Sequence, residues 1–356
     1  TAHCGGCGVV CASGEVCGGG QCLPPSCAGA LQCQGESCCD SPEVPGGTFP
    51  MGRGLSGTDA WSGTSLFSAD EVPEHPVTVG SYRLDKYEVT VGRMRNFIAA
   101  YDAWRAAGHP AEGEGAHPEI PGSGWSPAWN DLVTTGGATP GIKMFSESAA
   151  AVVESLTTYC NPGLGIPSYS ATAGTREDYP INCVSWYLAF AFCVWDGGYL
   201  PTEAQWEYAA AGGDDNRLYP WGALSPEGRA NFGADTTSGA LTLDDILRSV
   251  GSYPDGAGRW GHLDLAGSLA EWNLDVYASD WYSTGGANCT DCANLADWSG
   301  AGLKHPWRGG TWASDGSSAD YANLRAAARY PVVGREPGGS VGHEDGIRCA
   351  RPIRTN

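Results

Sequence analysis

Fifteen cysteines constrain this chain more than any other feature, and nine of them fall within the first 39 residues. Such a density is usual only where disulfides persist, as in secreted, extracellular or periplasmic proteins. Residues 1–43 otherwise hold small side chains with almost nothing apolar to bury, so cross-links must hold this segment together. The sequence therefore predicts a disulfide-stapled module over 1–43 and a larger domain over 44–356, in a protein of the cell envelope or the exterior.

Two Cys-x-x-Cys pairs, Cys4 with Cys7 and Cys289 with Cys292, have the spacing of half a zinc site. Neither has a second Cys or His pair at zinc-finger spacing, so disulfide formation is the favoured interpretation. On this interpretation Cys289 and Cys292 close a tight local loop.

Cys160 and Cys183 bracket the end of a long insertion, and we expect them to pair. The nine amino-terminal cysteines are an odd number, so one of them must bond the domain, bond another chain, carry a modification or stay free. Self-association or an intermolecular disulfide through the module is one of these open alternatives. We expect the module to mediate attachment, so that the chain without residues 1–43 still folds.

The charge balance excludes one class of partner. Asp and Glu number 40 against 20 Lys and Arg, which gives a net charge of −20. Such a surface repels phosphate backbones and anionic lipids, so we expect no nucleic-acid partner. No apolar run approaches the roughly 18 residues of a membrane span, and the chain opens without a signal segment, so we expect a mature protein with no transmembrane segment.

Loops should make up much of the backbone. The 53 glycines and 23 prolines are about a fifth of the 356 residues, whereas ordinary chains hold roughly 12 % of the two together. Residues 102–180 are especially rich in Gly, Pro, Ser and Ala and are expected to form long surface insertions with little regular structure. A helix bundle is therefore excluded.

Helical spacing of apolar residues predicts three helices. The first begins after the N-cap Thr90, and the second begins after Ser185 and ends at the glycines 197–198. The third opens with a capping box at 202–205. Short strands are predicted at 77–79, 82–84 and 347–349.

Eight segments occur in one recognisable order along the chain. They are 46–52, 74–79 with 87–90, 184–186, YLPTEAQWEYA at 199–209, 219–222, DLAGSLAEW at 264–272, 308–312 and 346–350. This series resembles the sulfatase-modifying-factor family, whose best-known members are the formylglycine-generating enzymes. The resemblance implies a loop-rich α/β (α+β) fold of the C-type-lectin-like kind over 46–350, with the module 1–43 outside it.

The family's chemistry depends on two cysteines that bind copper and oxygen, so that a substrate cysteine is oxidised to formylglycine. Aligned on residues 324–329, these positions hold Tyr321 and Ala326, and no cysteine lies between Cys292 and Cys349. A soft Cu(I) ion needs thiolates. The comparison with the family therefore implies no catalytic residue at these positions, no copper and no formylglycine-generating activity.

Iron is not expected either. Another branch of the family binds iron through three histidines, but the seven histidines here are scattered, with no His-x-x-x-His pair. His109 and His117 lie eight residues apart in a glycine-rich insertion. The remaining metal-like clusters, 262–264 and 343–345, are better explained as solvated loops or as part of a calcium site.

The resemblance also implies two structural calcium sites, built from the oxygen ligands that hard cations prefer. The first would use the side chains of Asn231 and Asp244 and the carbonyls of Phe232 and Ile246. The second would use the side chains of Asp264 and Glu271 and the carbonyls of Gly267 and Leu269. The competing explanation is that acidic residues, which are abundant here, occupy these positions by chance. Ser268 stands where the family usually has Asn, which is expected to loosen the second site.

The family further implies a disulfide between Cys193, on the helix after 184–186, and Cys349 in the last strand. Such a bridge closes a loop of about 155 residues and contributes several kcal/mol in the loop-entropy model.

Two functions remain open. The first is a non-catalytic, calcium-stabilised binding or structural protein, whose ligand (a protein, a small molecule or a glycan) occupies a groove lined by Trp312, Tyr321, Arg325 and Arg329. The second is a metal-dependent oxidoreductase with altered chemistry in the same groove. An alternative interpretation of Arg325 and Arg329 is that they form buried ion pairs that hold the fold together. The absence of both thiolates favours the binding protein.

Overall fold

The computed structural model describes residues 4, 15–18, 21–54, 56–57, 68–132, 145–160, 166–234, 241–298, 303–314, 321–333 and 344–353. The helices within those ranges are α1 (Val91–Ala106), α2 (Ala149–Thr157), α3 (Trp186–Trp195), α4 (Glu203–Ala211) and α5 (Leu243–Ile246). The strands there are β1 (Val16–Gly18), β2 (Gln21–Leu23), β3 (Gln32–Cys33), β4 (Glu36–Ser37), β5 (Glu43–Val44), β6 (Gly47–Met51), β7 (His75–Val79), β8 (Tyr82–Leu84), β9 (Ala270–Trp272), β10 (Lys304–Arg308), β11 (Tyr330–Val333), β12 (Asp345–Gly346) and β13 (Ala350–Arg351). Short elements joined by long loops confirm the expected loop-rich α/β fold.

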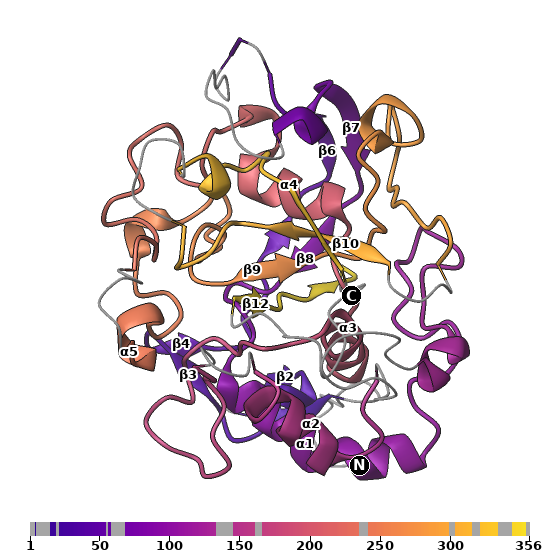
Figure 1. Cartoon of the computed structure of the whole chain (residues 1–356), viewed down its shortest axis with the longest axis vertical. Helices are drawn as coiled ribbons and strands as arrows, with labels where there is room; N and C mark the ends of the chain where they lie inside the picture. Colours follow the sequence, from indigo (N-terminus) through magenta and orange to yellow (C-terminus); the bar gives the residue numbers. More distant parts are fainter. Residues whose placement is uncertain are drawn as a thin grey trace.

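Two small sheets occupy the middle of the molecule (Figure 1). The first has the order β11-β10-β9-β12, with β10 antiparallel and β12 parallel to β9, and the second has the order β13-β8-β5. The helix α4 lies on one side of these strands, and α3, α2 and α1 lie on the other. The register places Arg308 opposite Glu271 and so brings both charged side chains to the centre of the fold.

The predicted helix starts are confirmed. The hydroxyls of Thr90 and Ser185 accept hydrogen bonds from the backbone N–H groups three residues later, at the starts of α1 and α3. Thr202 and Gln205 form the expected capping box of α4. Gly212 ends α4 with a φ of 70°, a left-handed conformation that glycine adopts without strain.

One predicted strand is wrong. Strands 77–79 and 82–84 lie in β7 and β8, but residues 347–349 are in no strand and instead connect β12 to β13. The chain leaves one sheet at Gly346 and enters the other at Ala350. Between them the buried Arg348 turns its guanidinium toward Glu271 on β9, with Nη2 at 2.8 Å from a carboxylate oxygen.

The insertion at 102–180 is less superficial than its composition predicts. It contains α2, which the sequence interpretation missed, although Ser148 caps this helix by accepting from the N–H of Ala151. Trp125, Trp129 and Phe145 from the same insertion are buried in the core cluster that also holds α1 and α3. The described part of the insertion therefore contributes aromatic side chains to the interior.

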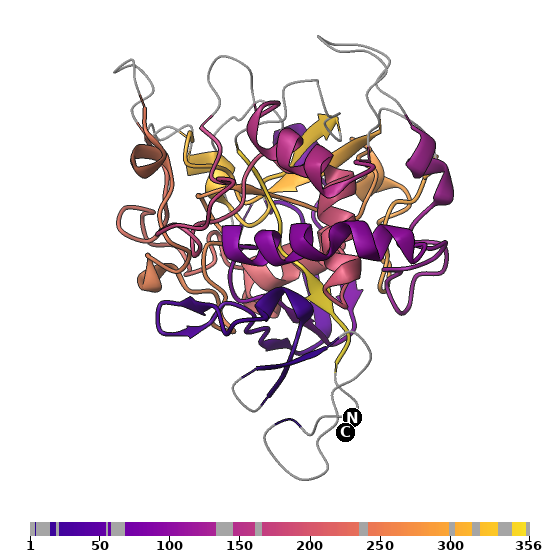
Figure 2. The same cartoon turned by 90° about the horizontal axis from the view of Figure 1, so that it is seen from below.

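The amino-terminal segment also packs on the domain. β5 pairs with β8, so residues 43 and 44 belong to the same sheet as β13. Leu31 packs against a cluster that contains Cys33, Cys38, Tyr87 and Val250. Figure 2 shows this indigo segment directly beneath α1.

Among the described residues, no helix has both the length and the apolar character that crossing a membrane requires.

Candidate functional site

Tyr321 and Ala326, the positions that the family resemblance aligns with the two cysteines, are the first residue of a short 3-10 turn, Tyr321–Leu324, and the second residue after it. Ala326 is buried, and its N–H donates to the carbonyl of Leu218 at 2.9 Å. The crevice beside Ala326 is lined by Gly52, Glu207 and Arg325, among others, and leaves no room for a water molecule. The side chain at the position that the resemblance aligns with a cysteine is therefore a buried methyl group.

Arg325 and Arg329 form buried ion pairs, as the sequence predicts. The two terminal nitrogens of the Arg325 guanidinium, Nη1 and Nη2, donate to Glu71 at 2.9 and 2.8 Å. Arg329 donates to Glu203 on α4 at 2.7 and 2.8 Å. All four side chains are about 1 % exposed. Arg329 therefore ties its loop to α4, and Arg325 ties the same loop to the 3-10 turn Ser68–Glu71.

The residues expected to line a groove do not share a surface. Trp312 is buried in a cluster with Leu243, Ile246 and Leu269, and both arginines are buried as well. Of the four, only Tyr321 keeps partial exposure. Its hydroxyl donates to Glu227, and its ring makes an edge-on contact with Phe232 at a centroid distance of 5.6 Å.

The two carboxylates expected to bind calcium at the second site, Asp264 and Glu271, lie near each other at β9. Glu271 accepts from Arg348 and, at 2.7 Å, from the indole N–H of Trp206. Asp264 has a φ of 59°, and its Oδ2 accepts from the N–H of Gly251 at 2.6 Å.

Glu88 joins these two carboxylates and was missed by sequence reasoning. Its Oε1 accepts from the N–H of Leu269 and its Oε2 from the hydroxyl of Ser268, both at 2.9 Å. Glu88 thus braces the loop whose carbonyls were expected to bind calcium. The sequence signal for Glu88 was its position in the family segment 87–90. No local sequence pattern connects Glu88 to Ser268, which lies 180 residues further along the chain.

The acidic cluster, defined as Glu88, Asp264, Glu271 and Arg348, is unbalanced in charge. Three carboxylates face one guanidinium among the described residues. Burial, together with the charges of Asp264 and Glu271, raises the pKa of Glu88 well above its usual value. Burial also raises the pKa of Asp264 to about 6. A cation bound beside these carboxylates would relieve the repulsion between them.

The first set of expected calcium ligands is only partly assembled. The side-chain amide of Asn231 donates to the carbonyl of Ile246 at 2.9 Å, so these two groups meet. Asp244 is exposed, and its carboxylate accepts from Arg176 at 2.6 Å and Tyr179 at 3.0 Å. Phe232 is partly exposed and packs on Tyr321.

Across the described ranges, no three Asp, Glu, His or Cys side chains converge closely enough to hold a metal ion alone. A calcium ion at the acidic cluster would therefore have to complete its shell with the backbone carbonyls of Gly267 and Leu269.

The histidines occupy separate places. His109 bonds to Glu114 at 2.8 Å, whereas His305 stacks on Trp186 and contacts the carbonyl of Asp275. Burial lowers the pKa of His117 to about 4 and that of His305 to about 3. His343 lies outside the described residues.

The expected domain disulfides are bonded in the structure. They are Cys193–Cys349, Cys160–Cys183 and Cys289–Cys292. In the amino-terminal segment Cys4 bonds Cys17, Cys27 bonds Cys39 and Cys33 bonds Cys38. The odd cysteine remains a prediction, because residues 7 and 11 lie outside the described ranges.

Comparison with known proteins finds a family model that matches most of the chain. A family model described as the sulfatase-modifying factor enzyme 1-like domain matches residues 31–353. The chain is 31% identical over 319 residues to a formylglycine-generating enzyme of Thermomonospora curvata, covering 86% of this chain and 91% of that protein. It is 30% identical over 237 residues to a Mus musculus protein named inactive C-alpha-formylglycine-generating enzyme 2, covering 64% and 68%.

Among solved structures, PvdO from Pseudomonas aeruginosa has a TM-score of 0.49 at 19% identity, over 87% of this chain and 93% of that chain. The family match begins at residue 31 and so includes residues 31–43, which the sequence interpretation placed outside it.

Proposed function

The chain belongs to the sulfatase-modifying-factor family, and we propose that it is a non-catalytic member, a calcium-stabilised binding or structural protein of the cell exterior or envelope. The observation that carries the proposal is Ala326. This residue has no group that can ligate copper, and the crevice beside it does not admit water. Tyr321, at the other cysteine position, donates its hydroxyl to Glu227.

The family itself supports an inactive member. The relative from Mus musculus carries the word inactive in its name. An oxidoreductase with altered chemistry would need other groups at the same place. Arg325 and Arg329, the basic candidates, are each committed to a buried carboxylate. This commitment favours the binding protein over the enzyme.

The proposed calcium ion would lie at the acidic cluster. Asp264 and Glu271 would supply carboxylate oxygens, Gly267 and Leu269 would supply carbonyl oxygens, and Glu88 would brace the loop. The excess of negative charge supports this site. The other expected site, at Asn231, Phe232, Asp244 and Ile246, is a weaker candidate, because Asp244 binds Arg176 instead.

The proposed ligand surface is an aromatic patch around Tyr321. Trp221, Phe232 and Tyr321 are partly exposed and pack against a small apolar cluster beneath them. Leu224, next to Trp221, is 61% exposed. Partly exposed aromatic rings with polar tips are typical of binding surfaces, and the ligand would be a protein, a small molecule or a glycan.

The activity proposal is tested with a cysteine-containing sulfatase peptide, copper, oxygen and a reductant. We expect mass spectrometry to find the peptide thiol unchanged, while a formylglycine-generating enzyme converts the same peptide in parallel. A mass loss of about 18 Da that depends on this protein would overturn the proposal. The variant Tyr321→Phe is the control, because any real turnover at this position should respond to the hydroxyl.

A further inference from the structure

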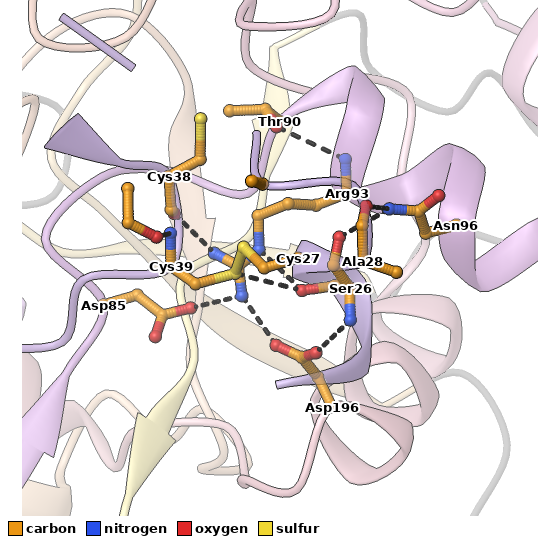
Figure 3. The surroundings of a disulfide bond; sticks show 12 residues. Ser26, Cys27, Ala28, Cys38, Cys39, Asp85, Thr90, Arg93, Asn96 and Asp196 are labelled. Atoms are coloured by element: carbon orange, nitrogen blue, oxygen red, sulfur yellow. Dashed lines mark hydrogen bonds and ion pairs between the residues drawn. A yellow bond between two sulfur atoms is a disulfide. The ribbon is translucent and has the colours of Figure 1, made fainter. Parts of the chain in front are cut away.

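Residues 24–44, called here the N-terminal strap, lie across the start of α1 and the end of α3 (Figure 3). A 3-10 turn at Pro25–Cys27 opens the strap. The side chain of Asn96 on α1 donates to the carbonyls of Ser26 and Ala28 at 2.8 and 3.0 Å. At its other end the strap becomes β5 and pairs with β8.

Four buried charged residues lie beneath the strap and are called here the quartet. They are Asp85, Arg93, Asp196 and Arg351. Arg93 contacts Asp85 at 2.9 Å and Asp196 at 2.7 Å, and Arg351 contacts the same two carboxylates at 3.1 and 2.6 Å. None of the four side chains is more than 6% exposed.

The strap supplies four hydrogen bonds to the quartet. The N–H of Ser26 donates to Asp196 at 2.9 Å, and the hydroxyl of Ser26 accepts from Arg93 at 2.9 Å. The carbonyl of Cys38 accepts from Arg93 at 3.4 Å, and the hydroxyl of Ser41 donates to Asp85 at 2.6 Å. Removing the strap would leave these buried charged groups with unmet hydrogen bonds, which is costly.

The Cys27–Cys39 disulfide joins the two parts of the strap that make these bonds. Cys27 follows Ser26 and Cys39 follows Cys38, and the bond spans 12 residues of sequence. Cys27 is 0% exposed and Cys39 is 4% exposed, so the strap must open before a reductant can reach the bond.

We propose that the Cys27–Cys39 disulfide is a latch that holds the N-terminal strap over the quartet, so that the whole domain is stable only when this bond is oxidised. Reduction by a dithiol breaks the S–S bond, delivers one electron and one proton to each sulfur, and converts the dithiol to its own disulfide. This inference is independent of calcium binding and of the proposed absence of catalysis.

The test compares two disulfide deletions in the full chain. Cys27→Ala with Cys39→Ala removes the latch, and Cys4→Ala with Cys17→Ala is the matched control, because its bond spans 13 residues. The loop-entropy cost in the unfolded chain is nearly equal for both. We expect the latch variant to lower the melting temperature at least twice as much as the control. Equal shifts would overturn the proposal.

A second measurement applies even where the latch variant fails to fold. The wild-type chain is exposed to graded dithiothreitol, thiols are alkylated, and mass spectrometry reports which cysteines have reacted. We expect the near-UV circular dichroism of the buried tryptophans to disappear together with alkylation of Cys27 and Cys39, at a point where Cys193–Cys349 is still intact. A native near-UV spectrum in molecules alkylated at Cys27 and Cys39 would contradict the latch.

Discussion

Two buried charge clusters include residues that closely follow β8, Asp85 in the quartet and Glu88 in the acidic cluster, and the clusters differ in charge balance. The quartet places two arginines between two aspartates, and burial is outweighed by Arg351, Arg93 and the hydroxyl of Ser41, which lower the pKa of Asp85 to about 2. The acidic cluster has three carboxylates around Arg348, and burial raises the pKa of Glu88 and Asp264. The charges of the quartet neutralise one another. The excess negative charge of the acidic cluster has to be neutralised by a cation or by protons.

Breaking the balance of the quartet should give the largest effect. Arg93→Met leaves Asp85 and Asp196 with only Arg351, so we expect the free energy of unfolding in urea to fall by about 3–5 kcal/mol. Arg95→Met, two residues along the same helix, removes a partly exposed pair with Glu177 and should cost less than about 1 kcal/mol. Similar losses for both variants would show that the quartet is not special.

Removing a negative charge from the acidic cluster should instead raise the stability of the fold. In chelator, Glu88→Gln removes a repelled carboxylate and keeps an acceptor for Leu269, so we expect stability to rise by about 1 kcal/mol. In calcium the same variant should gain less from the metal than the wild type. Thermal melts of both proteins in both buffers check this prediction, and a loss of stability in chelator would contradict it.

As the pH is lowered, the buried neutral histidines should begin to destabilise the fold at a higher pH than the quartet does. Because the folded pKa values of His117 and His305 are lowered to about 4 and about 3, the unfolded chain binds more protons below pH 6.5. The contribution of these two histidines to stability should therefore fall as the pH drops from 6.5 toward 4, whereas Asp264, whose folded pKa is raised to about 6, contributes in the opposite direction. Asp85 has a lowered folded pKa of about 2, so its contribution is present above about pH 4 and is lost as the pH falls through 2.

His117→Gln should flatten the upper part of this pH dependence, since it removes one group that takes up a proton on unfolding. Urea denaturation at intervals between pH 7 and 4 measures the slope. A slope identical to that of the wild type would mean that the pKa of His117 is the same in the folded and the unfolded protein.

The smallest effect is expected at the other calcium candidate. Asp244 is exposed and bound to Arg176, so Asp244→Asn should leave both the melting temperature and its response to calcium nearly unchanged. If Asp244→Asn abolished the response to calcium, the calcium ion would have to be assigned to the site at Asn231 instead.

Local signals in the sequence were sufficient for part of this fold. Thr90, Ser185 and Thr202 marked three helix starts, because an N-cap needs only a residue three positions later. The strand at 347–349 was wrong because apolar spacing does not show that the chain crosses between two sheets there. The helix α2 was hidden by the glycine-rich composition around it.

Local sequence patterns could not predict the two charged clusters. Arg93 meets Asp196 across 103 residues of sequence, and Glu88 meets Ser268 across 180. The family segments identified Asp264 and Glu271, but they gave no sign that the strap closes over α1. The sequence places residues 1–43 in a separate module because of their composition and because they lie outside the family resemblance, and that boundary stays a prediction until the latch is tested.

The central claim is that the acidic cluster is completed by calcium. Metal-stripped protein, verified by elemental analysis, is melted with chelator and with calcium at about one hundred times its dissociation constant, where binding adds about 2.7 kcal/mol. We predict a higher melting temperature in calcium for the wild type and no calcium response for Asp264→Asn combined with Glu271→Gln. Identical melting curves of the stripped wild type in calcium and in chelator would contradict the account.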